Sequence, residues 1–255
     1  MNKAIRFTAR LLAPWHLDDP LIGALRHARD AASRSYWHVR RGLGRVDRRR
    51  IDAHLGGPGP VRLHLGCGEH LLQGWLNADF FPTAPDVIHI DATRRFPLPD
   101  ASVDRIFSEH MIEHLSYVDG LTMLAECRRV LKPGGRIRVS TPDLLALLDL
   151  CRKDRSALQQ QFLDWSTERF IDWAPYAGEA IFLNHFVRSW GHQFVYDEAT
   201  LRDSMRRCGF AEITAHAINL SDDPLLRDLE NEARMPAGLL ALHSMTLEAV
   251  RPAAG

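Results

Sequence analysis

The stretch at residues 61–70, VRLHLGCGEH, most constrains what this chain can fold into. Apolar residues alternate over residues 61–65 and predict a buried strand, and Gly66 and Gly68 follow it directly. Glycine lets the backbone approach a ligand closely, and ligands of parallel sheets bind beyond the carboxyl ends of the strands. The pattern therefore predicts a small-molecule site after the first strand. A Gly-x-Gly pair also closes ordinary turns, so the residues that follow must identify the ligand.

Strand and helix patterns alternate along the rest of the chain, which predicts an α/β fold with a mostly parallel sheet and helices on both of its faces. Further strands are expected at residues 75–80, 86–90, 103–108, 136–143, 211–218 and 244–250. Apolar residues recur at helical spacing over residues 121–131. Asp197 is placed to begin a later helix, and Gly209 is placed to end it.

The 255 residues are enough for one main domain with appendages. Residues 1–60 hold twelve lysines and arginines against five aspartates, although the whole chain has no net charge. We expect residues 1–60 to form a basic helical arm that ends in the linker GGPGP, and residues 61–255 to form the main domain. The arm either packs as a solvated helix or contacts an acidic partner or a membrane surface through residues 1–55. It has too few aromatic residues for a single-stranded nucleic acid.

The four cysteines lie far apart without a CxxC pair, so the sequence indicates neither a disulfide framework nor a cysteine zinc site. The opening residues are interrupted by Lys3, Arg6 and Arg10, which argues against a signal peptide. A reducing cytoplasm is the expected compartment, with the basic arm able to reach the inner face of the membrane.

Two acidic residues end successive predicted strands. Asp79 can accept hydrogen bonds from ribose hydroxyls, and Asp91 or the backbone N–H of Ala92 can meet a purine. Together they favour an adenosine group. A nicotinamide site would need a third glycine at the position of Leu71 and an acidic residue about 20 residues after the glycines. Asp79 follows Gly68 by only 11 residues, so this spacing does not fit. The alternative is that both aspartates only cap turns or helices.

The segments LHLGCGEHLLQGWLNAD, FPLPDASVDRIFSEHMIEHL and RRVLKPGGRIRVSTPD, in this order, closely resemble the class I S-adenosylmethionine-dependent methyltransferases. SWGHQFVYDEATLRDSMRRCGF resembles a segment of the bacterial type 11-like branch, which is often associated with surface polysaccharide assembly. The resemblance implies a Rossmann-like sheet of seven strands with an antiparallel last strand, and S-adenosyl-L-methionine as the cofactor. It further implies cofactor contacts from Gly66, Cys67, Gly68, Asp79, Asp91, Ala92 and Glu109. The path from Gly68 to Asp79 is too short for the usual first helix.

Methyl transfer to a hydroxyl needs a base, and histidine is the natural candidate at neutral pH. His110 follows the fourth predicted strand. His185 and His192 lie in or beside residues 144–190, which we expect to form a helical insertion over the acceptor pocket. The alternative for each of the three histidines is that it is a packed or solvent-facing residue without a catalytic role.

His110, Glu113 and His114 would share one face of a helix and could together bind a metal ion. The arrangement resembles a metal-binding motif in the methyltransferases of ubiquinone biosynthesis, whose first position is a carboxylate rather than a histidine. We favour the alternative, in which Glu113 and His114 brace the end of the sheet by hydrogen bonds and no metal binds.

The expected function is O-methylation of a sugar, a glycan intermediate or another small molecule, by analogy with the family. The alternatives are N-methylation or aromatic O-methylation of a small metabolite, and a non-catalytic cofactor-binding module that acts through its basic arm.

Overall fold

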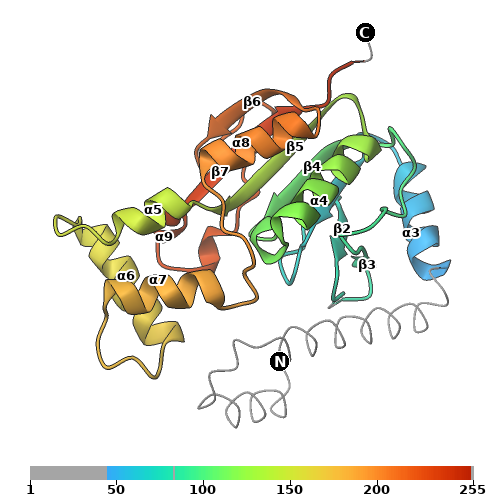
Figure 1. Ribbon diagram of the computed structural model, residues 1–255. Helices are drawn as coiled ribbons and strands as arrows, with labels where there is room; N and C mark the ends of the chain where they lie inside the picture. The colour runs from blue at the N-terminus through green and yellow to red at the C-terminus, as the bar shows by residue number, and fades with distance from the viewer. Residues whose placement is uncertain (1–44, 83, 254–255) are drawn as a thin grey trace. The chain divides into compact units, whose positions relative to one another are not determined.

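The computed structural model describes residues 45–82 and 84–253, which contain a seven-stranded sheet (Figure 1). The strand order is β3-β2-β1-β4-β5-β7-β6. The strands are β1 (Arg62–Leu65), β2 (Leu76–Asp79), β3 (Ile88–His89), β4 (Val103–Glu109), β5 (Leu131–Pro142), β6 (Ala211–His216) and β7 (Ser244–Val250). Strand β1 lies inside the sheet and pairs in parallel with both β2 and β4.

The last strand is antiparallel, as the resemblance implies. Strand β7 pairs antiparallel with β5 on one side and with β6 on the other, whereas β1 to β5 are mutually parallel. Strand β7 therefore starts at the edge of the sheet where β1 and β4 end. The connection between β6 and β7, residues 217–243, also begins and ends at this edge.

One face of the sheet carries the main core. Helix α4 (Tyr117–Val130) and helix α8 (Glu198–Arg207) lie on the same face (Figure 1) and contact each other. Met123, Leu124 and Cys127 of α4 are fully buried in this core, which also contains Ile51 of helix α3 (Arg45–Leu55). Asp197 begins α8 as predicted, because its side chain accepts a hydrogen bond from Thr200 N at 2.8 Å.

Short helical turns cover the opposite face. Successive strand residues point to opposite faces, so Phe107 lies away from the core that contains Ile106. It packs with Trp75, Leu226 and Leu229. Leu226 belongs to the 3-10 helix η2 (Pro224–Leu226). The connection between Gly68 and Asp79 contains no helix, as its length predicts.

A helical lobe follows β5 and has its own core. It consists of α5 (Leu144–Asp149), α6 (Ala157–Phe170), α7 (Glu179–Arg188) and, from the connection before β7, α9 (Leu239–His243) (Figure 1). Phe162, Phe182 and Leu239 are buried together in it. Ser156 begins α6 with a capping box, in which Ser156 and Gln159 each bond the other's backbone N–H.

Several boundaries differ from the sequence prediction. Strand β3 has only two residues, and β5 begins at Leu131 rather than at 136 because the chain of KPGG bulges out between the pairs Val103–Leu131 and Arg105–Arg136. Of the predicted basic arm, residues 1–44 lie outside the described part of the chain. No helix among the described residues is both long and apolar enough to cross a bilayer.

Candidate functional site

A cavity of about 260 Å³ lies at the carboxyl ends of β1 and β4. This is the edge at which open parallel sheets bind ligands. Its lining comes from the turn after β1, the end of β4 and the connection before β7: His64, Gly66, Cys67, Gly68, Glu69, His70, Glu109, His110, Asn231 and Arg234. The structure thus brings together five of the predicted site residues, namely Gly66, Cys67, Gly68, Glu109 and His110.

The turn after β1 depends on its glycines. Gly66 and Gly68 both have positive φ angles, of 74° and 52°, which side chains strongly disfavour. A Cβ atom on Gly66 would lie 2.3 Å from the Met111 Cγ atom, whereas a Cβ on Gly68 would meet nothing within 4 Å. Gly68 therefore leaves open space beside the backbone. Burial raises the pKa of the Cys67 thiol to about 12, so the thiol stays protonated and fills space between the glycines.

Asp79 braces this turn from the end of β2. Its Oδ2 atom accepts a hydrogen bond from Gly68 N at 2.9 Å, and its Oδ1 atom accepts one from Phe81 N at 2.7 Å. Each carboxylate oxygen has a second lone pair, so the group can still accept from a ligand. Asp79 does not line the cavity.

Asp91 and Ala92 also lie outside the lining of the cavity. The Asp91 Oδ1 atom accepts hydrogen bonds from Thr93 N and Thr93 Oγ1 at 3.0 and 2.7 Å, and Oδ2 lies 3.3 Å from Arg94 Nε. The turn-capping role that the sequence left open for Asp91 is thus present. A contact with adenine stays a prediction.

Glu109 is a buried carboxylate on the wall of the cavity. It accepts hydrogen bonds from Asn231 N, and its Oε1 atom lies 3.1 Å from Arg234 Nη2. Burial raises the pKa of Glu109, and the positive charge of Arg234 opposes that rise. The pair places one negative and one positive group at the same wall.

His110 is the one histidine base candidate in the cavity lining. It follows β4 with a φ angle of 47°, and its backbone N–H bonds to Ser140 O at 2.8 Å. The Nε2 atom lies 2.8 Å from Ser244 Oγ, and Nδ1 lies 3.4 Å from Glu113 Oε1. Burial, together with the charge of Arg234, lowers the pKa of His110 well below its ordinary value, so the imidazole is neutral at neutral pH.

The other two histidine candidates do not line the cavity. His185 lies in α7, where its Nδ1 atom is 3.0 Å from Ser189 Oγ. His192 follows α7, and its Nδ1 atom bonds to Phe186 O at 2.7 Å. Burial lowers the pKa of both imidazoles, that of His192 to about 4. Neither is placed to take a proton from a molecule in this cavity.

The helix assumed for the metal hypothesis does not form. Glu109 ends a strand, His110 has a left-handed backbone, and only Ile112–His114 form a short 3-10 helix, η1. Glu113 is fully buried and accepts a hydrogen bond from Thr141 Oγ1 at 3.0 Å. Burial raises the pKa of Glu113 to about 7. His110 therefore points to Ser244 and Glu113 rather than sharing a helix face with His114.

Sequence reasoning missed the wall made by residues 217–243. Asn231 and Arg234 come from this connection, and Arg234 lies at the end of the 3-10 helix η3 (Glu232–Arg234). The predicted topology could have revealed this wall, because an antiparallel last strand must start at the ligand-binding edge. The long connection before it must therefore lie there too.

Comparison with known proteins adds an independent observation. Residues 75–139 match the model of a family described as a methyltransferase domain. This segment of the chain is therefore similar to a methyltransferase domain. The matched segment runs from β2 to β5, and so includes Asp79, Asp91 and the end of β4 at Glu109.

Two curated relatives share parts of the chain. A probable S-adenosylmethionine-dependent methyltransferase of Mycolicibacterium smegmatis is 53% identical over 47 residues, which are 18% of either chain. An uncharacterized 37.1 kDa protein in transposon TN4556 of Streptomyces fradiae is 31% identical over 117 residues, which cover 36% of this chain and 33% of the relative. The matches thus span a third or less of the length of these curated relatives.

Solved structures of methyltransferases are more distant. An S-adenosylmethionine-dependent methyltransferase from Mesorhizobium loti has 17% identity and a TM-score of 0.44, with 82% of this chain and 99% of that chain covered. The putative methyltransferase in a complex with the Haloferax volcanii Trm112 activator has 15% identity and a TM-score of 0.43, with 89% and 95% covered.

The residues at the domain's ligand-binding edge fit S-adenosylmethionine. The open space beside Gly68 admits a group close to the backbone, and the carboxylates of Asp79 and Glu109 stand on either side of the β1 turn with lone pairs for hydroxyl or ammonium donors. A cofactor with a ribose and an ammonium group matches this donor and acceptor pattern.

Proposed function

We propose that this chain is an S-adenosylmethionine-dependent methyltransferase that methylates an oxygen atom of a sugar, a glycan intermediate or another small molecule. The observation that carries the proposal is the cavity at the glycine turn, formed by the ends of β1 and β4. Strand β4 lies within the match to a methyltransferase domain, and β1 with the glycine turn precedes it. The choice of oxygen and of a sugar rests on the resemblance of the sequence to the polysaccharide-associated branch.

Named residues of the chain would hold the cofactor. The backbone of Gly66, Cys67 and Gly68 would approach the methionine part, Asp79 the ribose, and Asp91 with Ala92 the adenine, while Glu109 would face the methionine ammonium. The chemistry that bound S-adenosylmethionine supplies is an electrophilic methyl group on a positively charged sulfur. The protein's contribution is to align the acceptor with it, to exclude water and to remove the acceptor's proton.

His110 is the proposed base. With a proton on Nδ1, which faces Glu113 Oε1, the Nε2 atom is the one that accepts a proton. Ser244 Oγ lies 2.8 Å from Nε2 and helps to orient the ring of His110 at the cavity. Because its pKa is lowered, His110 is in the accepting form throughout the neutral range.

The first experiment is calorimetric titration with S-adenosylmethionine and its demethylated product, with NAD as the control. Binding of the first two without NAD, followed by methyl transfer to a panel of nucleotide sugars and glycan intermediates, is the expected result. Absence of binding to both would end the proposal. Transfer to amines alone would replace the oxygen acceptor, and binding without transfer to any acceptor would favour the non-catalytic module.

His110→Ala tests the proposed base. We expect turnover to fall at least about 100-fold, a typical contribution of a general base, while the affinity for the cofactor changes less than about threefold. Turnover and affinity measured on His185→Ala provide the matched control, because His185 lies outside the cavity lining. If His110→Ala reduces both quantities equally, His110 is a structural residue.

A further inference from the structure

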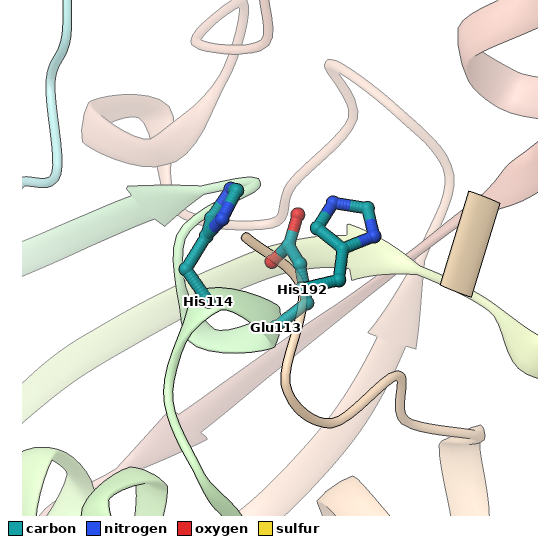
Figure 2. A group of neighbouring side chains, drawn as sticks. All are labelled: Glu113, His114 and His192. Carbon is teal, nitrogen blue, oxygen red and sulfur yellow. The ribbon is translucent and has the colours of Figure 1, made fainter. Parts of the chain in front are cut away.

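Three side chains outside the cavity lining converge beside the end of β4. Glu113, His114 and His192 each offer one ligand atom, and these atoms lie within 4.8 Å of one another (Figure 2). Glu113 and His114 belong to η1, whereas His192 follows α7 of the helical lobe. The group therefore joins two parts of the chain that are far apart in sequence.

Hydrogen bonds hold these two segments in place. Gln193 N and Phe194 N donate to Glu113 O at 2.8 and 3.2 Å, and Gln193 Nε2 donates to His114 O at 2.6 Å. The backbone on both sides of the group is thus fixed by groups other than the three side chains. Such support is what a metal site needs before the ion arrives.

His192 has one ring nitrogen left for a metal ion. His192 Nδ1 is bound to Phe186 O at 2.7 Å, which leaves Nε2 as the available ring nitrogen. Ligating histidines commonly have their other nitrogen bonded to a backbone carbonyl in this way. The rings of His114 and His192 lie with their centroids 4.9 Å apart.

One carboxylate oxygen of Glu113 is buried without a hydrogen-bond partner among the described residues. The side chain is fully buried, and Oε2 accepts from Thr141 Oγ1 at 3.0 Å. Oε1 has no hydrogen-bond partner among the described residues, and His110 Nδ1 stands 3.4 Å from it. A buried carboxylate oxygen without such a partner needs compensation, either by a proton, as the raised pKa of Glu113 indicates, or by a cation.

We propose that Glu113, His114 and His192 bind a divalent transition-metal ion, with Zn²⁺ as the ion that this ligand set suits best. Two imidazoles and one carboxylate form a common three-residue zinc site with one open position, and nitrogen-rich sites disfavour Mg²⁺. Zinc ligands lie about 2.0–2.2 Å from the ion, so side-chain rotation must draw the three atoms closer together. The ion would compensate the Glu113 charge and tie η1 to the helical lobe.

Metal binding is testable without the cofactor, so its failure is distinct from failure of the proposed methyltransferase activity. The full-length chain is stripped with a chelator and titrated with Zn²⁺ in competition with a chromophoric chelator, and separately with Mg²⁺. We expect one Zn²⁺ per chain with a Kd below about 1 μM, corresponding to more than about 8 kcal/mol, and much weaker Mg²⁺ binding. Co²⁺ should give the visible absorption of a four-coordinate site.

Variants assign the ion to these residues. Glu113→Gln keeps the size of the side chain, and we expect it and His192→Ala to weaken Zn²⁺ binding by more than about 100-fold, the upper end of losses seen for supporting residues alone. His185→Ala removes a histidine from the same lobe and should bind Zn²⁺ like the wild type. If His192→Ala does not fold by circular dichroism, His192→Gln takes its place. Absence of Zn²⁺ binding by the wild type, or unchanged binding by Glu113→Gln, would overturn the proposal.

Discussion

At the scale of the single residue, Asp79 links the turn after β1 to the end of β2. Its carboxylate accepts from the backbone N–H groups of Gly68 and Phe81, one on each side. Gly66 N and Cys67 N also donate to Ala78 O, at 2.8 and 3.0 Å. The shape of the glycine turn therefore depends on β2, and a change at Asp79 acts on the turn as well as on the proposed ribose contact.

Asp79→Ala should weaken binding of S-adenosylmethionine and of its demethylated product by at least about tenfold. The reason is the loss of hydrogen bonds to a charged group, each contributing about 1.5–3 kcal/mol. Calorimetry measures the affinity, and Asp154→Ala, which removes an exposed carboxylate of the helical lobe, is the control. An affinity equal to that of the wild type would remove Asp79 from the cofactor site.

His64 shows how burial makes a residue sensitive to acid. Its ring is almost fully buried, stands 5.0 Å from the Phe107 ring and hydrogen-bonds to Asn77 Oδ1 at 3.2 Å. Burial lowers its pKa from 6.5 to about 3. Between these pH values the unfolded chain binds a proton that the folded chain excludes, so stability is full above pH 6.5 and declines as the pH falls toward 3.

His64→Leu should therefore flatten the acid side of the stability curve. The wild type loses on the order of 4 kcal/mol through this residue on acidification, and the variant does not. At pH 7 the variant loses one hydrogen bond, about 1 kcal/mol, while Asn77 Oδ1 keeps its bond from Leu72 N. Urea unfolding at a series of pH values measures both effects. Burial also lowers the pKa values of His192 and His243, but their contributions to the pH dependence of stability are the same in both proteins and cancel in the difference. Parallel curves for the two proteins would contradict this account.

At the scale of the element, the connection 217–243 completes the cavity. It supplies Asn231 and Arg234 to the wall, and Arg234 is the cation beside buried Glu109. Strand β7 must start where β1 and β4 end, and the connection is held at this edge by the topology of the sheet. Its residues therefore face the ligand although they lie far along the chain from the glycine turn.

Arg234→Ala should lower the affinity for the cofactor by at least about tenfold, because Glu109 loses its compensating charge and its pKa rises further. The loss should be smaller at higher pH, where Glu109 ionises again. Calorimetric titration over a range of pH values checks both statements. Arg227→Ala removes an arginine of the same connection that bonds Ser221 O and does not line the cavity, so equal losses in the two variants would deny Arg234 a specific role.

The predictable part of the site is local in sequence. Gly66, Gly68, Glu109 and His110 follow strands whose alternation is visible in the sequence, so their position at one edge follows from the parallel sheet. His185 and His192 belong to the helical lobe, and Arg234 belongs to the connection before β7. The position of both segments depends on packing between parts of the chain that are distant in sequence. The hydrogen bonds of Gln193 to Glu113 and His114 illustrate this dependence, since no local pattern predicts them.

At the scale of the whole molecule, the end of β4 joins the cavity to the helical lobe. Glu109 and His110 line the cavity, and three residues later Glu113 meets the chain that follows α7. His110 itself lines the cavity, and its ring lies with its centroid 5.5 Å from that of His243 in α9 of the helical lobe. A change in the lobe therefore has a short path to the proposed base, and the lobe can affect turnover without touching the cofactor.

A deletion that tests the basic arm must leave helix α3 in place. Deleting residues 1–55 would also remove Ile51, which is fully buried in the main core. Loss of a buried isoleucine costs several kcal/mol, so that deletion would confuse docking with stability. Deleting residues 1–44 leaves α3 intact.

We expect the chain without residues 1–44 to bind the cofactor with unchanged affinity. If the arm contacts a membrane rather than packing as a solvated helix, the shortened chain also binds anionic lipid vesicles more weakly than the full chain does. The removed segment carries eight lysines and arginines against three aspartates, and each basic residue near an anionic surface contributes about 1 kcal/mol. Vesicle sedimentation measures the docking, with uncharged phosphatidylcholine vesicles as the control. Equal sedimentation of the two proteins with anionic vesicles would leave the arm without a membrane role. A fall in cofactor affinity would instead make residues 1–44 part of the site, because the deletion leaves every residue of the cavity wall in place.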